Sequence, residues 1–215
     1  MRHIDPQTEP HVFNDKVRVP GRRFLAKLRR TPTTKEFNNH SYWRQILPEL
    51  HDSYSGICAY SCHWIPYDTG ADTVEHFIPK SLKPRQAYEW KNYRLVCATL
   101  NGRKGTHKDV LDPFHVENGW FVLDFPSLQV KPARDLDDVL KGRIWATITR
   151  LGLNDDGTCL KSRAKYIRDY CTGCVNMQHL RQDAPFIAYE LERQGLVHTI
   201  NDIMGYPSEP CLLDD

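Results

Sequence analysis

The sequence predicts an α+β fold, and two kinds of pattern carry this prediction. In the middle of the chain, over about residues 56–112, short runs of strand-forming residues alternate with turn residues. From about residue 113 onward, apolar residues recur at three- and four-residue intervals, which is the spacing of one helix face. The 215 residues, 40% of them apolar and 26% charged, suffice for one sizeable core or two small ones.

The first predicted region, residues 1–55, is a basic extension followed by a helix. Its basic block, residues 16–35, holds eight Lys or Arg and no acid. The segment HSYWRQILPELHDSY, residues 40–54, has aromatic and aliphatic residues at helical intervals. Pro48 within this segment limits or kinks the predicted helix.

The second predicted region, residues 56–112, contains two short strands and a helix. Asp68-Thr69-Gly70-Ala71-Asp72 supplies turn chemistry, so we expect a strand on each side of it, the second over TVEHF. Pro79 then interrupts the extended chain. A helix is expected over residues 94–104, with Gly105 as its stop.

The third predicted region, residues 113–215, is mainly helical. WFVLDFPSLQVKP, residues 120–132, is typical of a strand pair around a turn. Helical spacing then covers three segments, residues 135–153, 162–182 and 185–200. We expect these helices to pack on the core and to dock a partner.

The residues of catalytic type are concentrated in the second region. A bend at the end of the TVEHF strand would bring Glu75 and His76 to one cleft, where Asn101 from the helix could share a hard divalent cation with Glu75. A neutral imidazole accepts a proton from water near neutral pH. With Arg103 or Lys104 holding a phosphate, this set suits metal-assisted hydrolysis of a phosphodiester.

Two basic blocks flank these residues, although the net charge is only +2. Besides residues 16–35, the stretch from Lys80 to Lys108 holds eight Lys or Arg against the single acid Glu89. Such blocks attract a polyanion more strongly than the average charge indicates. A solvated surface is the alternative for either block taken alone.

The order Glu75-His76, Asn92, Asn101 and Lys104 resembles the motif of HNH endonucleases, which have a ββα-metal fold. The segments VEHFIPKS, YEWKNYRLVC and LNGRKG are similar to those of HNH proteins of the PtuB type. That group is encoded with PtuA-like ATPases in Septu and retron anti-phage systems. The MRHIDP start, GICAY and TITRLGLN also fit the group, so the resemblance spans most of the chain.

The resemblance implies a ββα-metal core and a role for each motif residue. Glu75 and Asn101 would bind Mg²⁺ or Mn²⁺, and His76 would be the general base. Asn92 would brace the loop that carries the base, and Lys104 would contact phosphate. The expected nucleic-acid contacts are Lys80, Arg94, Arg103, Lys104 and Lys108.

The resemblance also implies a biological setting. The chain would be a cytoplasmic, metal-dependent endonuclease acting on DNA, the effector of a prokaryotic anti-phage defence system. Its partner would be a PtuA-like ATPase of the ABC or SMC type, accompanied in the retron setting by a reverse transcriptase and its nucleic acid. No membrane partner is expected, because the sequence has no apolar run of membrane length.

The family's zinc knuckle is incomplete in this sequence. Its two Cys-x-x-Cys pairs would fall on Cys58 with Ser61 and on Cys97 with Leu100, so two of the four thiolates are absent. Cys62 could replace Ser61 only with a shift of one residue. We therefore do not expect a structural Zn²⁺ at Cys58, Cys62 and Cys97, and we expect Leu100 to fill the space by packing.

Three alternatives remain open at this stage. The chain could be a catalytically weak module of the same fold that binds nucleic acid or its ATPase. It could be a restriction-type enzyme for modified DNA, although no base-flipping pocket is evident. Finally, Cys171 and Cys174 have a spacing that permits zinc binding, although two thiols within a helical apolar pattern more often fill a core.

Overall fold

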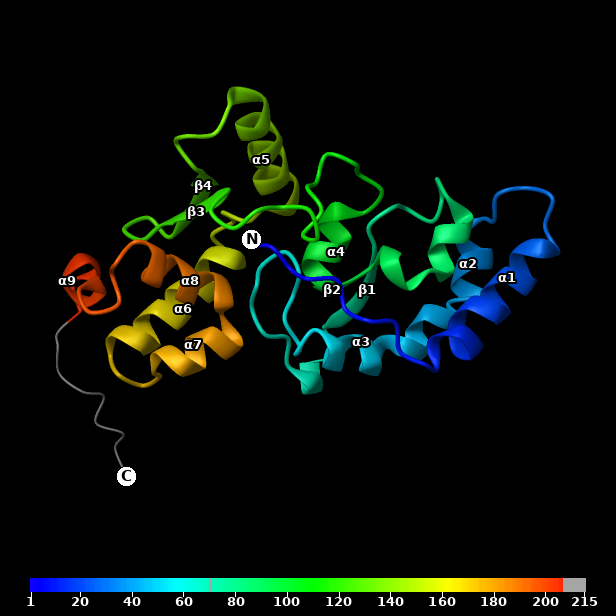
Figure 1. Cartoon of the computed structure of the whole chain (residues 1–215), viewed down its shortest axis with the longest axis horizontal. Coiled ribbons are helices and arrows are strands. Elements are labelled where there is room, and N and C mark those ends of the chain that lie inside the picture. Colours follow the sequence, from blue (N-terminus) through cyan, green and yellow to red (C-terminus); the bar gives the residue numbers. More distant parts are fainter. Residues whose placement is uncertain (70, 207–215) are drawn as a thin grey trace. The chain divides into compact units, whose positions relative to one another are not determined.

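The computed structural model describes residues 1–69 and 71–206, so Gly70 of the expected turn lies outside the described residues. The chain forms two compact units (Figure 1). We call Ile4–Ala59 with Ile65–Lys108 the N-terminal unit. The C-terminal unit consists of Met1–His3, Tyr60–Trp64 and the described residues from Asp109 onward. Much of the predicted first and second regions therefore contributes to one unit.

The predicted α+β class is confirmed, since each unit combines helices with one two-stranded antiparallel sheet. In the N-terminal unit, β1 (Asp72–His76) pairs with β2 (Tyr93–Cys97). The register sets Glu75 opposite Arg94 and His76 opposite Tyr93. The helix α4 (Ala98–Lys104) follows β2 directly and packs against both strands (Figure 1).

Two local predictions for this region were wrong. The partner of β1 is β2 and not the segment before the turn, where a short 3₁₀ helix, η3 (Tyr67–Thr69), forms instead. The predicted helix starts four residues late, at Ala98, because the chain is still in β2 up to Cys97. Both errors have one cause. The run after Asn92 is buried along most of its length, and this burial favours a strand, which both pairs with β1 and delays the start of the helix.

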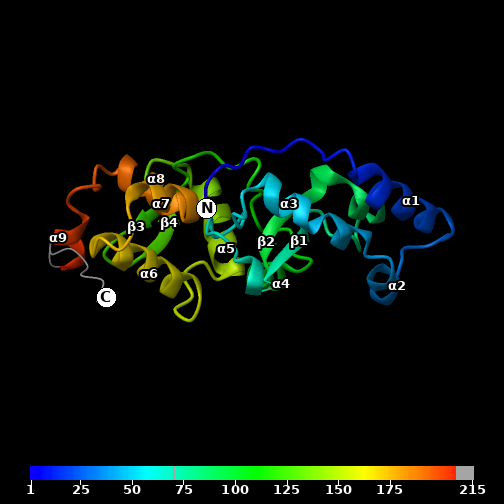
Figure 2. The same ribbon diagram turned by 90° about the horizontal axis from the view of Figure 1, so that it is seen from below.

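The helix expected over residues 40–54 is confirmed as two pieces, and it lies against the sheet. The 3₁₀ helix η2 (Tyr42–Ile46) runs into α3 (Leu47–Ser53), with Pro48 in the first turn of α3, where its missing N–H costs little. Contacts of α3 with both strands cover one face of the hairpin (Figure 2). The unit also contains η1 (Asn14–Arg18), α1 (Val19–Ala26), α2 (Thr34–Asn39), η4 (Pro84–Tyr88) and η5 (Trp90–Asn92).

An aromatic core joins these helices to the hairpin. Phe37 and Trp43 contact each other, and Trp43 also contacts Tyr88 with ring centroids 5.8 Å apart. The helix α1 reaches this core through Gly21, where a Cβ atom would lie 2.1 Å from Cγ of Tyr88. A glycine is therefore required for α1 to pack this closely.

In the C-terminal unit, the predicted strand pair is confirmed as β3 (Phe121–Asp124) with β4 (Gln129–Pro132). Helices form in all three predicted segments, but the second is divided in two and the helix of the third ends at Arg193, seven residues early. Gly173 adopts φ +74°, and the Asn176 side chain then caps a new helix by accepting from the His179 N–H. The helices are α5 (Asp138–Leu151), α6 (Cys159–Cys171), α7 (Met177–Asp183), α8 (Pro185–Arg193) and α9 (Ile200–Met204).

The helices of both units are short. Within residues 1–69 and 71–206, none combines the length and the apolar character that crossing a membrane requires.

Candidate functional site

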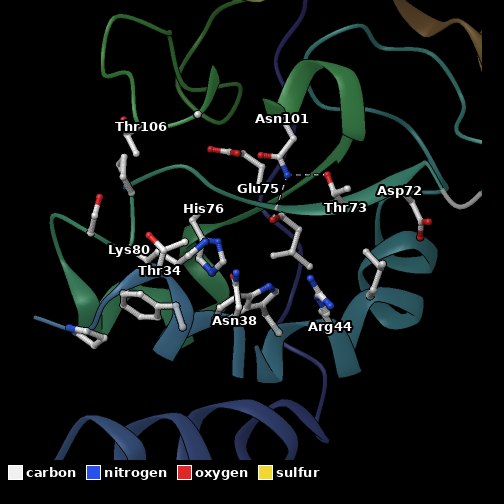
Figure 3. A pocket seen from close by; sticks show the side chains of 18 residues that line it. Thr34, Asn38, Arg44, Asp72, Thr73, Glu75, His76, Lys80, Asn101 and Thr106 are labelled. Atoms are coloured by element: carbon white, nitrogen blue, oxygen red, sulfur yellow. Dashed lines mark hydrogen bonds between the residues drawn. The ribbon is translucent and has the colours of Figure 1, made fainter. Parts of the chain in front are cut away.

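A pocket of about 630 Å³ opens beside β1 in the N-terminal unit (Figure 3). One wall is formed by β1 and the end of α4, and the facing wall by α2, η2 and the start of α3. Glu75, His76 and Asn101 all line it, so the structure brings together the three residues predicted to perform chemistry. Other lining residues include Thr34, Asn38, Trp43, Arg44, Thr73, Lys80 and Thr106.

Glu75 is a buried carboxylate at the floor of this pocket, with 2% of its surface exposed. Burial raises the pKa of Glu75 to about 7, although the positive charge of Lys104 acts in the opposite direction. Lys104 Nζ lies 2.5 Å from Glu75 Oε1. The second carboxylate oxygen has no partner within residues 1–69 and 71–206, so it can accept a ligand from the pocket.

Lys104 was predicted to contact phosphate, and its position does not allow that contact. Its side chain is 1% exposed, and Nζ lies 3.4 Å from the His76 carbonyl oxygen as well as beside Glu75. The Phe77 ring lies 5.6 Å from the same nitrogen. A buried ammonium paired in this way neutralises its carboxylate and does not reach a strand in solvent. We therefore correct the role of Lys104 from phosphate contact to partner of Glu75.

His76 is buried at the end of β1, and its ring has a defined tautomer. Nε2 lies 3.1 Å from the Ala87 carbonyl oxygen, which can only accept a hydrogen bond. Nε2 therefore carries the proton, and Nδ1 has its lone pair free of any hydrogen bond from the described residues. Burial, with a smaller effect from the charge of Lys80, lowers the pKa of His76 to about 3. Trp43 and Tyr93 hold the ring edge-on, with centroids 4.7 and 5.2 Å away.

Asn92 braces the loop between the two strands, which is the position expected for it. Its Oδ1 accepts from the Ile78 N–H at 2.7 Å, and its Nδ2 donates to the carbonyl oxygens of Ile78 and Gln86, each at 3.0 Å. The Asn92 carbonyl accepts from the Phe77 N–H. Asn92 is 3% exposed and does not line the pocket, so it positions the chain on both sides of the loop that carries Ala87.

Asn101 presents an oxygen to the pocket because Thr73 fixes its amide. The Thr73 hydroxyl donates to the Val96 carbonyl at 2.6 Å, so its oxygen is left as an acceptor. Asn101 Nδ2 donates to that oxygen at 2.8 Å (Figure 3). The amide oxygen consequently points away from Thr73, and it has no partner among the described residues. Together with Glu75, it offers the oxygen ligands that Mg²⁺ and Mn²⁺ prefer.

The five predicted nucleic-acid contacts lie in different environments. Lys80 lines the pocket, Arg103 is half-buried on α4, and Lys108 is exposed after it. Arg94 is 3% exposed and donates to the carbonyl oxygens of Lys91 and Tyr93, so we correct it to a structural residue. Arg94 and Lys104 are both turned into the interior, Arg94 from a strand that is buried along most of its length and Lys104 from the buried face of α4.

No cysteine of the described residues lines the pocket, and Cys211 lies outside them. Cys58 and Cys97 belong to the N-terminal unit, where the Cys97 N–H donates to Cys58 Sγ at 3.4 Å, whereas Cys62 belongs to the C-terminal unit. Leu100 is 1% exposed and packs in the core. Cys171 is buried, which raises its thiol pKa to about 11, and Cys174 is exposed. Within the described residues, no three His, Cys, Asp or Glu side chains gather as a metal-ligand set.

Two pocket residues were missed by the sequence reasoning. Thr73 stands two residues before Glu75, and strand alternation places residues i and i+2 on one face, so its role could have been inferred. Arg44 lies on η2, about thirty residues from β1 in the chain, and no local signal connects it to the site.

The fold and the pocket thus define an α+β protein with a carboxylate, an imidazole and an amide oxygen converging beside a strand end. A stretch of 84 residues is 32% identical to the Septu protein PtuB of Bacillus thuringiensis, covering 37% of this chain and 33% of that protein. This similarity supports a PtuB-like relationship. The chain therefore spans about a third of the length of this curated relative. No family model matches the chain.

Proposed function

We propose that this protein is a metal-dependent endonuclease of the HNH type that hydrolyses phosphodiester bonds of DNA. The observation that carries the proposal is the convergence of Glu75, His76 and Asn101 in one pocket. The hairpin of β1 and β2 followed by α4 has the element order expected for a ββα-metal core. The similarity to PtuB supports the same assignment independently of the geometry.

In this proposal His76 is the general base. Its Nε2 donates to the Ala87 carbonyl, so Nδ1 can accept a proton from water as that water attacks the phosphorus. The low pKa of the imidazole keeps it unprotonated at neutral pH. The edge-on contact with Trp43 and the loop held by Asn92 fix the ring, which reduces the motion that would otherwise separate base and water.

Glu75 and Asn101 would hold the cation through the free carboxylate oxygen and the amide oxygen. A bound Mg²⁺ or Mn²⁺ supplies positive charge that stabilises the phosphorane-like transition state and the leaving oxygen. Lys104 limits the cost of ionising Glu75 in the interior, since the buried carboxylate keeps an opposite charge at 2.5 Å. Phosphate contacts would include the half-buried Lys80 and Arg103 and the exposed Lys108.

We further propose that the protein is the effector of an anti-phage defence system. This part rests on its similarity to a Septu protein and on the resemblance in its motifs. The partner would be a PtuA-like ATPase, with a retron reverse transcriptase and its nucleic acid as a further setting. Control by a partner is physically reasonable, because a small nuclease with an intact site would otherwise damage host DNA.

A plasmid-nicking assay tests the proposed activity. The full chain, assembled with a PtuA-like ATPase as the proposed partner, is incubated with supercoiled DNA and Mg²⁺ or Mn²⁺. We expect His76→Ala to reduce nicking at least 100-fold, the lower limit typical of losing a general base. His107→Ala is the matched control, because His107 is exposed after α4 and outside the pocket. Equal inactivity of the wild type and His76→Ala would show that the catalytic assignment is wrong.

One observation favours a second candidate, a module of the same fold that binds nucleic acid or its ATPase without cleaving. The predicted metal carboxylate of Glu75 already has a cation, Lys104, at 2.5 Å. If that pair were permanent, a divalent ion would not bind. Isothermal titration calorimetry with Mn²⁺ separates the two candidate functions. If the wild type binds Mn²⁺ and Glu75→Gln does not, the nuclease is supported. If the wild type does not bind Mn²⁺, the binding module is supported.

A further inference from the structure

Four of the eight basic residues in the block at residues 16–35 are paired with acids. Lys16 pairs with Glu49, Arg22 with Glu89 and Arg30 with Glu36. Arg18 also contacts Glu9 and Glu89. Half of the basic block predicted from residues 16–35 is therefore neutralised on the protein itself, and its attraction for a polyanion is smaller than its sequence indicates.

Two cations in the pocket lack such partners. Arg44 and Lys80 both line it, and neither forms a salt bridge within residues 1–69 and 71–206. Arg44 is exposed on η2, and Figure 3 shows its guanidinium directed from the helical wall toward the strand. Lys80 follows Pro79 on the wall that carries His76.

Lys80 is held in place by aromatic rings. Its Nζ lies 5.1 Å from the centroid of the Trp43 ring and 6.0 Å from that of Phe37. Trp43 in turn contacts His76. The ammonium is therefore fixed beside the imidazole by a cation–π contact. Burial lowers the pKa of Lys80, the negative charge of Glu75 raises it, and the positive charge of Arg44 lowers it by a smaller amount, so the two cations lie close enough to repel each other.

Glu75 and Asp72 also line the pocket, but no salt bridge joins either of them to Arg44 or Lys80 within the described residues. Two cations that lack an ion-pair partner are stabilised by an anion bound between them. Resting on the proposed function, we propose that Arg44 and Lys80 form a phosphate subsite for the nucleic-acid backbone, separate from the cation ligands Glu75 and Asn101. The subsite binds a phosphate next to the one that is cut and so sets the strand across the pocket. Arg44 supplies the planar donor group, and Lys80 a point charge close to His76.

The subsite is tested by DNA binding of the full chain with its ATPase, in EDTA to prevent cleavage. Fluorescence anisotropy of a labelled DNA duplex is measured between 50 and 200 mM salt for the wild type, Arg44→Gln, Arg44→Lys and Arg85→Gln. Arg85 is the matched control, because it is an exposed arginine on η4 that does not line the pocket.

We expect Arg44→Gln to weaken binding about 10-fold and to reduce the slope of log K against log salt by about 0.9, the value for one phosphate contact. Arg44→Lys should keep the slope, and Arg85→Gln should keep both quantities. If Arg44→Gln behaves as Arg85→Gln while the wild type binds and nicks DNA, the subsite is wrong and the nuclease stands.

A further arm uses inorganic phosphate. If millimolar phosphate raises the melting temperature of the wild type but not of Arg44→Gln, while DNA binding is the same in both, the pocket binds free phosphate and the proposed backbone subsite is overturned. If the wild type neither binds nor nicks DNA, the proposed function fails and the subsite fails with it.

Discussion

Asn92→Ala should destabilise the N-terminal unit and loosen the loop between β1 and β2. The substitution removes three side-chain hydrogen bonds, one from the Ile78 N–H and two to the carbonyl oxygens of Ile78 and Gln86. Each contributes about 1 kcal/mol net, so the free energy of unfolding should fall by about 3 kcal/mol. The Ile78 amide should also lose protection, because its acceptor at 2.7 Å is gone.

Urea denaturation measures the first effect, and hydrogen exchange at Ile78 measures the second. Asn39→Ala is the control: Asn39 is exposed at the end of α2, makes no side-chain hydrogen bond within the described ranges, and should change stability by less than about 0.5 kcal/mol. The reasoning is refuted if Asn92→Ala loses no more stability than this control and Ile78 exchanges at the wild-type rate. Asn92 would then not brace the loop.

Three further outcomes follow from other contacts. Thr73→Val should lower the affinity for Mn²⁺ about 10-fold, because the amide of Asn101 loses its acceptor. Thr73→Ser keeps that acceptor, so its affinity should stay within about twofold of the wild type. Calorimetry measures both, and equal affinities of the two variants would show that Thr73 does not position Asn101. Burial lowers the pKa of His76 from 6.5 to about 3, so the folded state binds fewer protons and stability is lost as pH falls below 6.5. Between pH 7 and 5 in EDTA, the wild type should lose about 2 kcal/mol more than His76→Gln in urea denaturation, and parallel losses would contradict this. Gly21→Ala should lower the free energy of unfolding by about 2 kcal/mol, because its Cβ would lie 2.1 Å from the Tyr88 ring. Gly102→Ala has open space around it and should raise the free energy of unfolding by up to about 1 kcal/mol. A thermal melt that ranks the two variants the other way would refute the packing argument.

The buried pair of Glu75 and Lys104 explains why one site can be both preformed and controlled. A carboxylate with a raised pKa and a lysine at 2.5 Å is stable in the absence of a divalent ion. A cation entering the pocket would compete with Lys104 for Glu75 while gaining the amide oxygen of Asn101. In the proposed nuclease, the affinity for metal would depend partly on how easily Lys104 moves, a property that a docked partner could change.

Much of the fold and the site could be predicted from the sequence. The helical spacing after residue 135 and the strand pair around Pro126 depend on residues close in the chain. Propensity and spacing describe such local relations well. The grouping of Glu75 and His76 with Asn101, which is 25 residues after His76, was predicted from the resemblance to the HNH motif. The α+β class accordingly follows from the amino-acid sequence by itself, and the catalytic roles of Glu75, His76 and Asn101 stay a prediction.

Only the tertiary structure decided which strand pairs with β1 and which charges reach solvent. The partner, β2, lies beyond a loop of sixteen residues, and pairing at that distance depends on burial of both faces and not on a local turn signal. The same burial turned Arg94 and Lys104 inward, although the sequence marks them as surface cations. Arg44 joined the pocket because α3 packs across the hairpin and carries η2 with it. Packing between distant segments therefore decides which charges remain to bind a ligand.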